Sequence, residues 1–133
     1  GLTNSLRHQS AIEDAIQGTK RSENLTILTS GPTPPNPSEL LASSAMKNLI
    51  DSVSDFFDVV LVDTPPLSAV TDAQILSSYV GGAVIVVRAY ETKKESLAKT
   101  KKMLEQINTN ILGVVLYGVD SSESPSYYYY GVE

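Results

Sequence analysis

Four short apolar runs divide the chain, and each is bounded by residues that break regular structure. They are residues 25–28, 59–62, 83–87 and 111–116. The last three are nearly continuous and rich in Val and Ile, without the alternation of a half-exposed strand. This pattern predicts strands that are covered on both faces.

Helical patterns fill the intervals between these runs. The segments 10–13, 71–74 and 92–95 have the spacing of capping boxes, in which a Ser or Thr oxygen accepts an amide N–H at the start of a helix. The first is expected to open a short helix through Ile16, and Ser38 to cap a helix that ends near Ser54. The alternation of helices and strands predicts an α/β fold with a parallel sheet flanked by helices.

Length and composition allow one packed domain: 133 residues, 41% of them hydrophobic and 19% charged. The absence of Cys excludes disulfides, thiolate zinc sites and a cysteine nucleophile, and the single His8 excludes a multi-histidine metal site. No apolar run approaches the roughly 18–20 residues that span a bilayer. We therefore expect a cytoplasmic location.

Charge is unevenly distributed along the chain. The formal net charge is −5, which argues against a nucleic-acid partner. Residues 88–102 nevertheless contain six bases and only two acids. Their spacing favours the solvated face of a helix.

Asp63 is the sharpest candidate for chemistry, because it directly follows the apolar run 59–62. An apolar strand ending in Asp is the pattern of a Walker B carboxylate, which holds Mg²⁺ beside nucleotide phosphates. An Asp that caps a turn has the same local pattern. The following Pro65 and Pro66 fix the direction of the chain and would hold Asp63 in one pose.

Other polar residues follow predicted strands or begin predicted helices. Asp72 is interpreted as a first-turn acid rather than a second metal ligand. Arg88 could face a phosphate, form an ion pair or lie in solvent, and Tyr117 stands where a base or ribose could rest. The sequence contains neither G-x-x-x-x-G-K-[ST] nor G-x-G-x-x-G, so it has a candidate metal carboxylate but no phosphate cradle.

Residues 121–133 have low complexity and are predicted to form a flexible, Tyr-rich tail. Four of the seven tyrosines stand together there, as Tyr127, Tyr128, Tyr129 and Tyr130. The cluster has three interpretations: a sticky tail, an aromatic interaction patch, or a set of phosphoryl acceptors.

Several motifs resemble those of the bacterial tyrosine kinases (BY-kinases). Residues 59–66, VVLVDTPP, resemble the Walker B signature of that family, and residues 34–41, PPNPSELL, resemble its P-P-N-P-x-E-L-L stretch. The opening residues 1–3 resemble the sequence after its second nucleotide motif, and the Tyr-rich tail resembles its autophosphorylation cluster.

This resemblance implies a P-loop NTPase-like fold of the deviant Walker type, incomplete at the N-terminus. Residues 1–120 would be the C-terminal portion of the kinase domain. ATP and Mg²⁺ would be used, with Asp63 near the metal, Thr64 beside the nucleotide, and the four tail tyrosines as acceptors.

The resemblance also implies partners and a role. It implies a ring of identical copies that phosphorylate one another in trans, and a membrane activator, the polysaccharide co-polymerase. This partner would hold the kinase at the inner face of the membrane. The role implied is control of capsular or extracellular polysaccharide biosynthesis.

Two departures from the family pattern matter. The family's Walker A loop and Asp-x-Asp motif are not in this sequence, so the chain alone is expected not to transfer phosphoryl groups. Tyr117 stands where the family has Asn, which places a base contact there in question. Two alternatives stay open: an ATPase resembling MinD or ParA, and a non-catalytic interaction module of a polysaccharide assembly.

Overall fold

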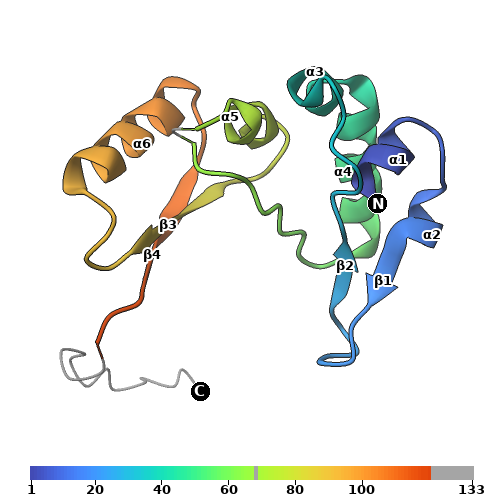
Figure 1. Ribbon diagram of the computed structural model, residues 1–133, viewed down its shortest axis with the longest axis horizontal. Helices are drawn as coiled ribbons and strands as arrows, with labels where there is room; N and C mark the ends of the chain where they lie inside the picture. The colour runs from blue at the N-terminus through green and yellow to red at the C-terminus, as the bar shows by residue number, and fades with distance from the viewer. Residues whose placement is uncertain (68, 121–133) are drawn as a thin grey trace. The chain divides into compact units, whose positions relative to one another are not determined.

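The computed structural model describes residues 1–67 and 69–120. It divides into two compact units, Gly1–Tyr79 and Val80–Glu133 (Figure 1). The predicted tail, residues 121–133, lies outside the described residues.

The first unit is mainly helical. Its elements are α1 (Leu2–Leu6), α2 (Ile12–Ala15), β1 (Ile16–Gly18), β2 (Thr26–Leu28), α3 (Pro37–Leu41), α4 (Ser44–Phe56) and α5 (Asp72–Ser77). Four side chains from α1, α4 and α5 form its buried core: Leu6, Met46, Ile50 and Leu76.

The first apolar run does not join a parallel sheet. Residues Thr26–Leu28 form β2, which pairs antiparallel with β1 in the register Ile16↔Leu28. The predicted helix through Ile16 was therefore one residue too long, since α2 ends at Ala15 and Ile16 already has extended backbone angles. Hairpin pairing with a nearby segment of the chain replaces the parallel pairing that we expected.

The predicted helix from Ser38 to Ser54 is two helices, α3 and α4, with a break at residues 42 and 43. Ser43 causes the restart: its hydroxyl accepts from the Met46 N–H at 3.3 Å and donates to the Leu40 carbonyl at 2.7 Å. One hydroxyl thereby serves the end of α3 and the start of α4.

An ion pair lies on the exposed face of α4. Lys47 Nζ donates to Asp51 Oδ2 at 2.6 Å, one helical turn away. This hydrogen bond, and secondarily the charge of Asp51, raises the pKa of Lys47. Because both side chains are exposed, the pair contributes little to stability.

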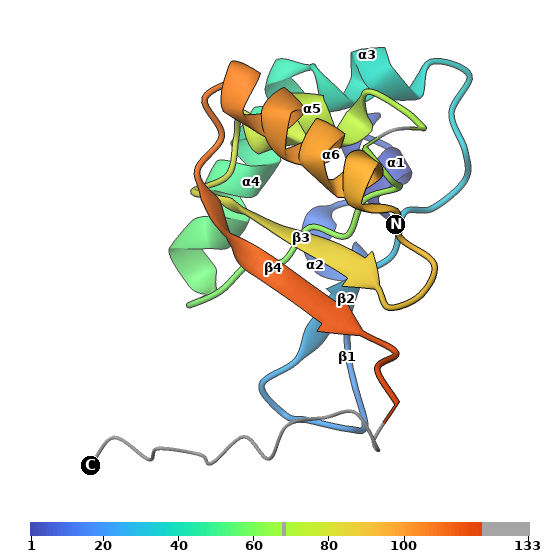
Figure 2. The same ribbon diagram turned by 90° about the vertical axis from the view of Figure 1, so that its left-hand side faces the viewer.

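The described part of the second unit contains β3 (Ala83–Arg88), α6 (Lys94–Gln106) and β4 (Ile111–Tyr117). The two strands are parallel, as predicted, with Ile85 opposite Val114 and Val87 opposite Leu116. Figure 2 shows them side by side, with α6 as the crossover. This confirms the α/β prediction of parallel strands joined through a helix.

The strands are not covered on both faces, contrary to our prediction. Along β3, Ile85 and Val87 are buried, whereas Val84 and Val86 are 50% and 62% exposed. Ile85 and Val87 lie on the face of the strands that α6 covers, because they line the same hollows as Leu97 of that helix. The opposite face has no cover among the described residues.

The run 59–62 is not a strand in this structure. Val59 and Leu61 are 72% and 88% exposed, and no described strand pairs with the segment. An isolated extended segment forms no ladder hydrogen bonds and leaves its exposed backbone groups to water, so an apolar sequence alone does not make it a strand. In the part of the chain that the structure describes, no helix is both long and apolar enough to cross a bilayer.

Candidate functional site

Asp63 lies in a loop of the first unit, directly before the two prolines. Its side chain is exposed, and it makes no hydrogen bond or ion pair with any described residue. Thr64 beside it is half-buried. The loop then turns, because the Ala69 N–H donates to the Pro66 carbonyl at 2.9 Å. The predicted carboxylate is therefore free to accept a ligand.

The surroundings of Asp63 bear on the metal prediction. No group of three or more acidic or histidine side chains that could hold a metal ion occurs among residues 1–67 and 69–120. A single carboxylate still fits Mg²⁺, which keeps several waters and takes its remaining oxygens from phosphates. Asp63 would thus be one ligand of a site that nucleotide phosphates complete, and Mg²⁺ would supply neutralisation of the phosphate charge.

Asp72 has a structural position, as interpreted from the sequence. It begins α5 and accepts a long hydrogen bond, 3.4 Å, from the Ser38 hydroxyl of α3. Thr71 lies 3.4 Å from the same hydroxyl and makes no capping hydrogen bond of its own. The Ser38 side chain therefore joins α3 to α5 instead of capping a helix.

The PPNPSELL segment builds the start of α3. Asn36 is the N-cap residue, Pro37 occupies the first turn, and the Asn36 amide donates to Glu39 Oε2 at 2.6 Å. Proline suits a first turn because no helical partner exists there for its missing N–H. The motif thus explains a helix start and its link to α5.

Arg88, at the end of β3, is held by local partners. Its guanidinium lies 3.2 Å from Glu91 and 5.9 Å from the centre of the Tyr117 ring, at the end of β4. Of the alternatives stated for Arg88, the structure shows an ion pair on a side chain that is 54% exposed. Tyr117 at this position contacts a cation of its own chain.

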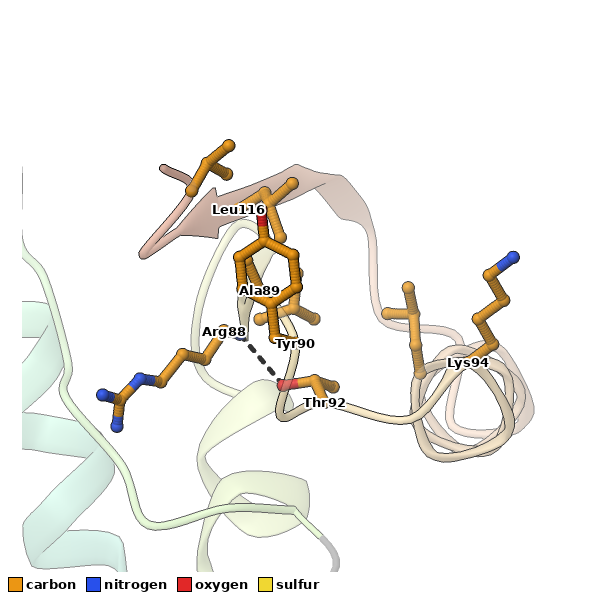
Figure 3. Close-up of a pocket in the computed structure, with 9 residues that line it drawn as sticks. Arg88, Ala89, Tyr90, Thr92, Lys94 and Leu116 are labelled. Atoms are coloured by element: carbon orange, nitrogen blue, oxygen red, sulfur yellow. Dashed lines mark hydrogen bonds between the residues drawn. The ribbon is translucent and has the colours of Figure 1, made fainter. Parts of the chain in front are cut away.

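The turn after β3 contains residues that the sequence did not single out. The Arg88 N–H donates to Thr92 Oγ1 at 2.9 Å, and Tyr90 has a positive φ of 63° (Figure 3). These residues line an open hollow of about 400 Å³ between α6 and the ends of β3 and β4. One feature of the sequence could have pointed to these residues: they directly follow a predicted parallel strand, and ligands bind at such strand ends in α/β sheets.

The candidate residues are distributed over the two units. Asp63, Thr64 and Asp72 belong to the first unit, whereas Arg88 and Tyr117 belong to the second. Tyr127 to Tyr130 lie outside the described residues, so their predicted role as acceptors stays a prediction.

Comparison with known proteins defines the relatives of the chain, although no protein-family model matches it. It is 42% identical over 133 residues to the tyrosine-protein kinase YwqD of Bacillus subtilis, covering 100% of this chain and 56% of that protein. It is 40% identical over 130 residues to the putative tyrosine-protein kinase CapB of Staphylococcus aureus, covering 98% and 57% respectively.

The fold agrees with the sequence comparison. The kinase domain of the Escherichia coli tyrosine kinase ETK matches 97% of this chain with a TM-score of 0.86 at 35% identity, and the match covers 50% of that domain structure. The chain thus spans little more than half the length of the relatives it matches. By sequence and by fold, it is a homologue of the bacterial tyrosine kinases and corresponds to about half of their kinase domain, which has the P-loop NTPase-like fold.

Proposed function

We propose that this chain is part of an ATP-dependent protein-tyrosine kinase that phosphorylates its own tyrosine cluster. Similarity to tyrosine kinases along the whole chain is the observation that carries the proposal. In this function Asp63 binds Mg²⁺, Thr64 lies beside the nucleotide, and residues 127–130 accept the phosphoryl group. The Asp63 carboxylate is exposed and has no partner among the described residues, which is consistent with that role.

The chemistry assigns limited tasks to these residues. Asp63 would hold the metal, with Pro65 and Pro66 restricting the backbone that carries it. The phosphate cradle and the group that accepts the tyrosine proton would come from the part of the kinase domain that this chain does not match. Because phosphoryl transfer depends on positioning and charge neutralisation by all of these parts, the 133 residues alone should not catalyse it.

The proposal extends to partners and setting. Identical copies would phosphorylate one another within a ring, and a membrane activator of the polysaccharide co-polymerase kind would hold the kinase at the inner face of the membrane. The process controlled would be capsular or extracellular polysaccharide biosynthesis. Support for this setting comes from the family resemblance of the motifs.

The test uses the coding region that contains this chain, expressed at the length of its relatives. With ATP and Mg²⁺, mass spectrometry should find phosphate on Tyr127 to Tyr130. Asp63→Asn should lower tail phosphorylation by at least about 100-fold, because it weakens metal-assisted charge neutralisation. Asp58→Asn, which removes a nearby exposed carboxylate, is the matched control and should leave phosphorylation unchanged.

Two results would contradict the proposal. Normal tail phosphorylation in the Asp63→Asn protein would remove the role of Asp63. Absence of phosphotyrosine, together with measurable ATP hydrolysis, would favour the alternative of an ATPase resembling MinD or ParA.

A further inference from the structure

An apolar groove runs between α6 and β4 in the second unit. Two adjoining hollows of about 400 and 460 Å³ form it, and they share Lys94 and Leu97. We call it the α6–β4 groove. Apolar side chains line most of it, namely Leu97, Ala98, Ile111, Val114, Leu116 and Val119.

Much of this lining is exposed. Val114 and Leu116 on β4 are 51% and 57% exposed, and Val119 beyond the strand is 38% exposed. Exposed apolar side chains that continue along one groove are typical of a binding surface. Isolated apolar side chains scattered over a protein surface are not. The groove therefore has room for an apolar or aromatic partner.

Cations border the groove. Lys94 lines both hollows and has no ion pair with any described residue, and Lys101 lines the second. Lys101 is 3.5 Å from Glu105, in an exposed pair that a stronger anion can displace. Both lysines belong to residues 88–102, which contain six bases and two acids in a chain of net charge −5. An occupant that is both aromatic and anionic would match these features.

The tail of the same chain acquires this chemistry when it is phosphorylated. Four adjacent phosphotyrosines combine aromatic rings with about −1.5 to −2 charges each. We propose that the phosphorylated tail, residues 121–133, binds in the α6–β4 groove of its own chain. Its rings contact the apolar lining, and its phosphates pair with Lys94 and Lys101. This inference rests on the proposed phosphorylation of residues 127–130.

The length of the tail permits this binding in cis. The chain leaves the structure at Asp120, next to Val119, which lines the groove. An extended stretch from Asp120 to Tyr127 reaches about 25 Å. Lys94 and Lys101 are about 10 Å apart along α6. The cluster can therefore turn back and lie beside both lysines.

The consequence is a switch in the state of the tail. Without phosphate, residues 121–133 carry only the negative charges of Glu123 and Glu133, so the two lysines attract the tail only weakly. With phosphate, the tail stays bound in the α6–β4 groove of its own chain. It is then no longer accessible to other copies of the chain. Phosphorylation thereby limits its own further spread.

The test is independent of kinase activity, because it uses a synthetic peptide with the sequence of residues 121–133. Fluorescence anisotropy would measure binding of its tetraphosphorylated and unphosphorylated forms to the 133-residue chain. The phosphorylated form should bind at least about 10-fold more tightly, the scale of one or two hydrogen bonds to charged groups. An excess of free phosphotyrosine should compete far better than inorganic phosphate, since the groove also contacts the ring.

Matched variants locate the site. Lys94→Gln with Lys101→Gln should weaken binding about 10-fold, whereas Lys20→Gln with Arg21→Gln, which removes two exposed charges of the first unit, should have no effect. Val119→Glu should weaken binding without loss of folding, as circular dichroism would verify. Equal loss in the two double variants, or equal binding of both peptides, would overturn the inference. A lack of kinase activity in the longer protein would overturn only the proposed function.

Discussion

At the scale of the residue, single hydroxyl groups decide where helices begin. The Ser43 hydroxyl both accepts from Met46 and donates to Leu40, whereas Thr92, which the sequence pattern marks as a cap, accepts from the Arg88 N–H instead. The residue at the N-cap of α6 is Lys93. Competing backbone donors at the end of β3 explain why this capping pattern misplaced the cap by one residue.

Removing the Ser43 hydroxyl should destabilise α4. We expect Ser43→Ala to cost about 1 kcal/mol, because an N–H at the helix start loses its acceptor. Ser44→Ala is the matched control, since Ser44 is exposed and its hydroxyl has no hydrogen bond among the described residues. Hydrogen exchange of the α4 amides would measure both. Equal protection in the two variants would show that Ser43 is not the effective cap.

The chemistry of single residues was partly predictable. The first-turn position of Asp72 follows from its neighbours in the sequence, whereas the exposed loop around Asp63 does not, because the expected strand before it does not form. The contact between Arg88 and Tyr117 does not, because it depends on the parallel pairing of β3 with β4. Contacts that need a long crossover have no local signal.

At the scale of the element, local patterns succeeded where each element has its own partner. The predicted strands 83–87 and 111–116 form, as β3 and β4, because one helix joins them and they pair with each other. The run 59–62 has an equally apolar sequence but no paired neighbour among the described residues, so it forms no strand. A strand forms only when a neighbouring strand pairs with it, so the sequence of one segment alone does not determine whether it becomes a strand.

Helix α6 is attached to the strands by few buried contacts, and Leu104 is the most buried of its side chains, at 3% exposure. We expect Leu104→Ala to destabilise the second unit by about 2–5 kcal/mol. Leu112→Ala removes the same group from a side chain that is 65% exposed and should cost less than about 1 kcal/mol. Hydrogen exchange of the β3 and β4 amides would distinguish them. Similar losses in both variants would contradict this assignment of the anchor.

At the scale of the whole molecule, apolar exposure is the dominant feature. On the β3 and β4 face opposite α6, Val84, Val86 and Val115 are each at least 50% exposed. A continuous patch of this kind favours association between molecules. The two tyrosine kinases compared above are almost twice as long as this chain. Composition alone could not predict the patch, since 41% hydrophobic content is ordinary.

Reducing this patch should reduce self-association. We expect Val86→Thr to raise the concentration at which the 133-residue chain associates, as light scattering would measure, with little change in folding. Val87→Thr is the matched control, because Val87 is 8% exposed and a buried hydroxyl without a partner costs about 1–3 kcal/mol. That variant should lose stability instead. If Val86→Thr left association unchanged, the patch would not be the associating surface.

The parallel pairing of β3 with β4 also imposes a delay during synthesis of the chain. Arg88 at the end of β3 cannot pair until Tyr117 at the end of β4 has been synthesised. At about 5–20 residues per second, this interval lasts roughly 1.5–6 s. During that time the apolar β3 segment has no β4 to pair with. The antiparallel strands β1 and β2 can pair almost as soon as β2 is synthesised. We therefore expect chaperones that act on nascent chains to bind the second unit rather than the β1–β2 hairpin.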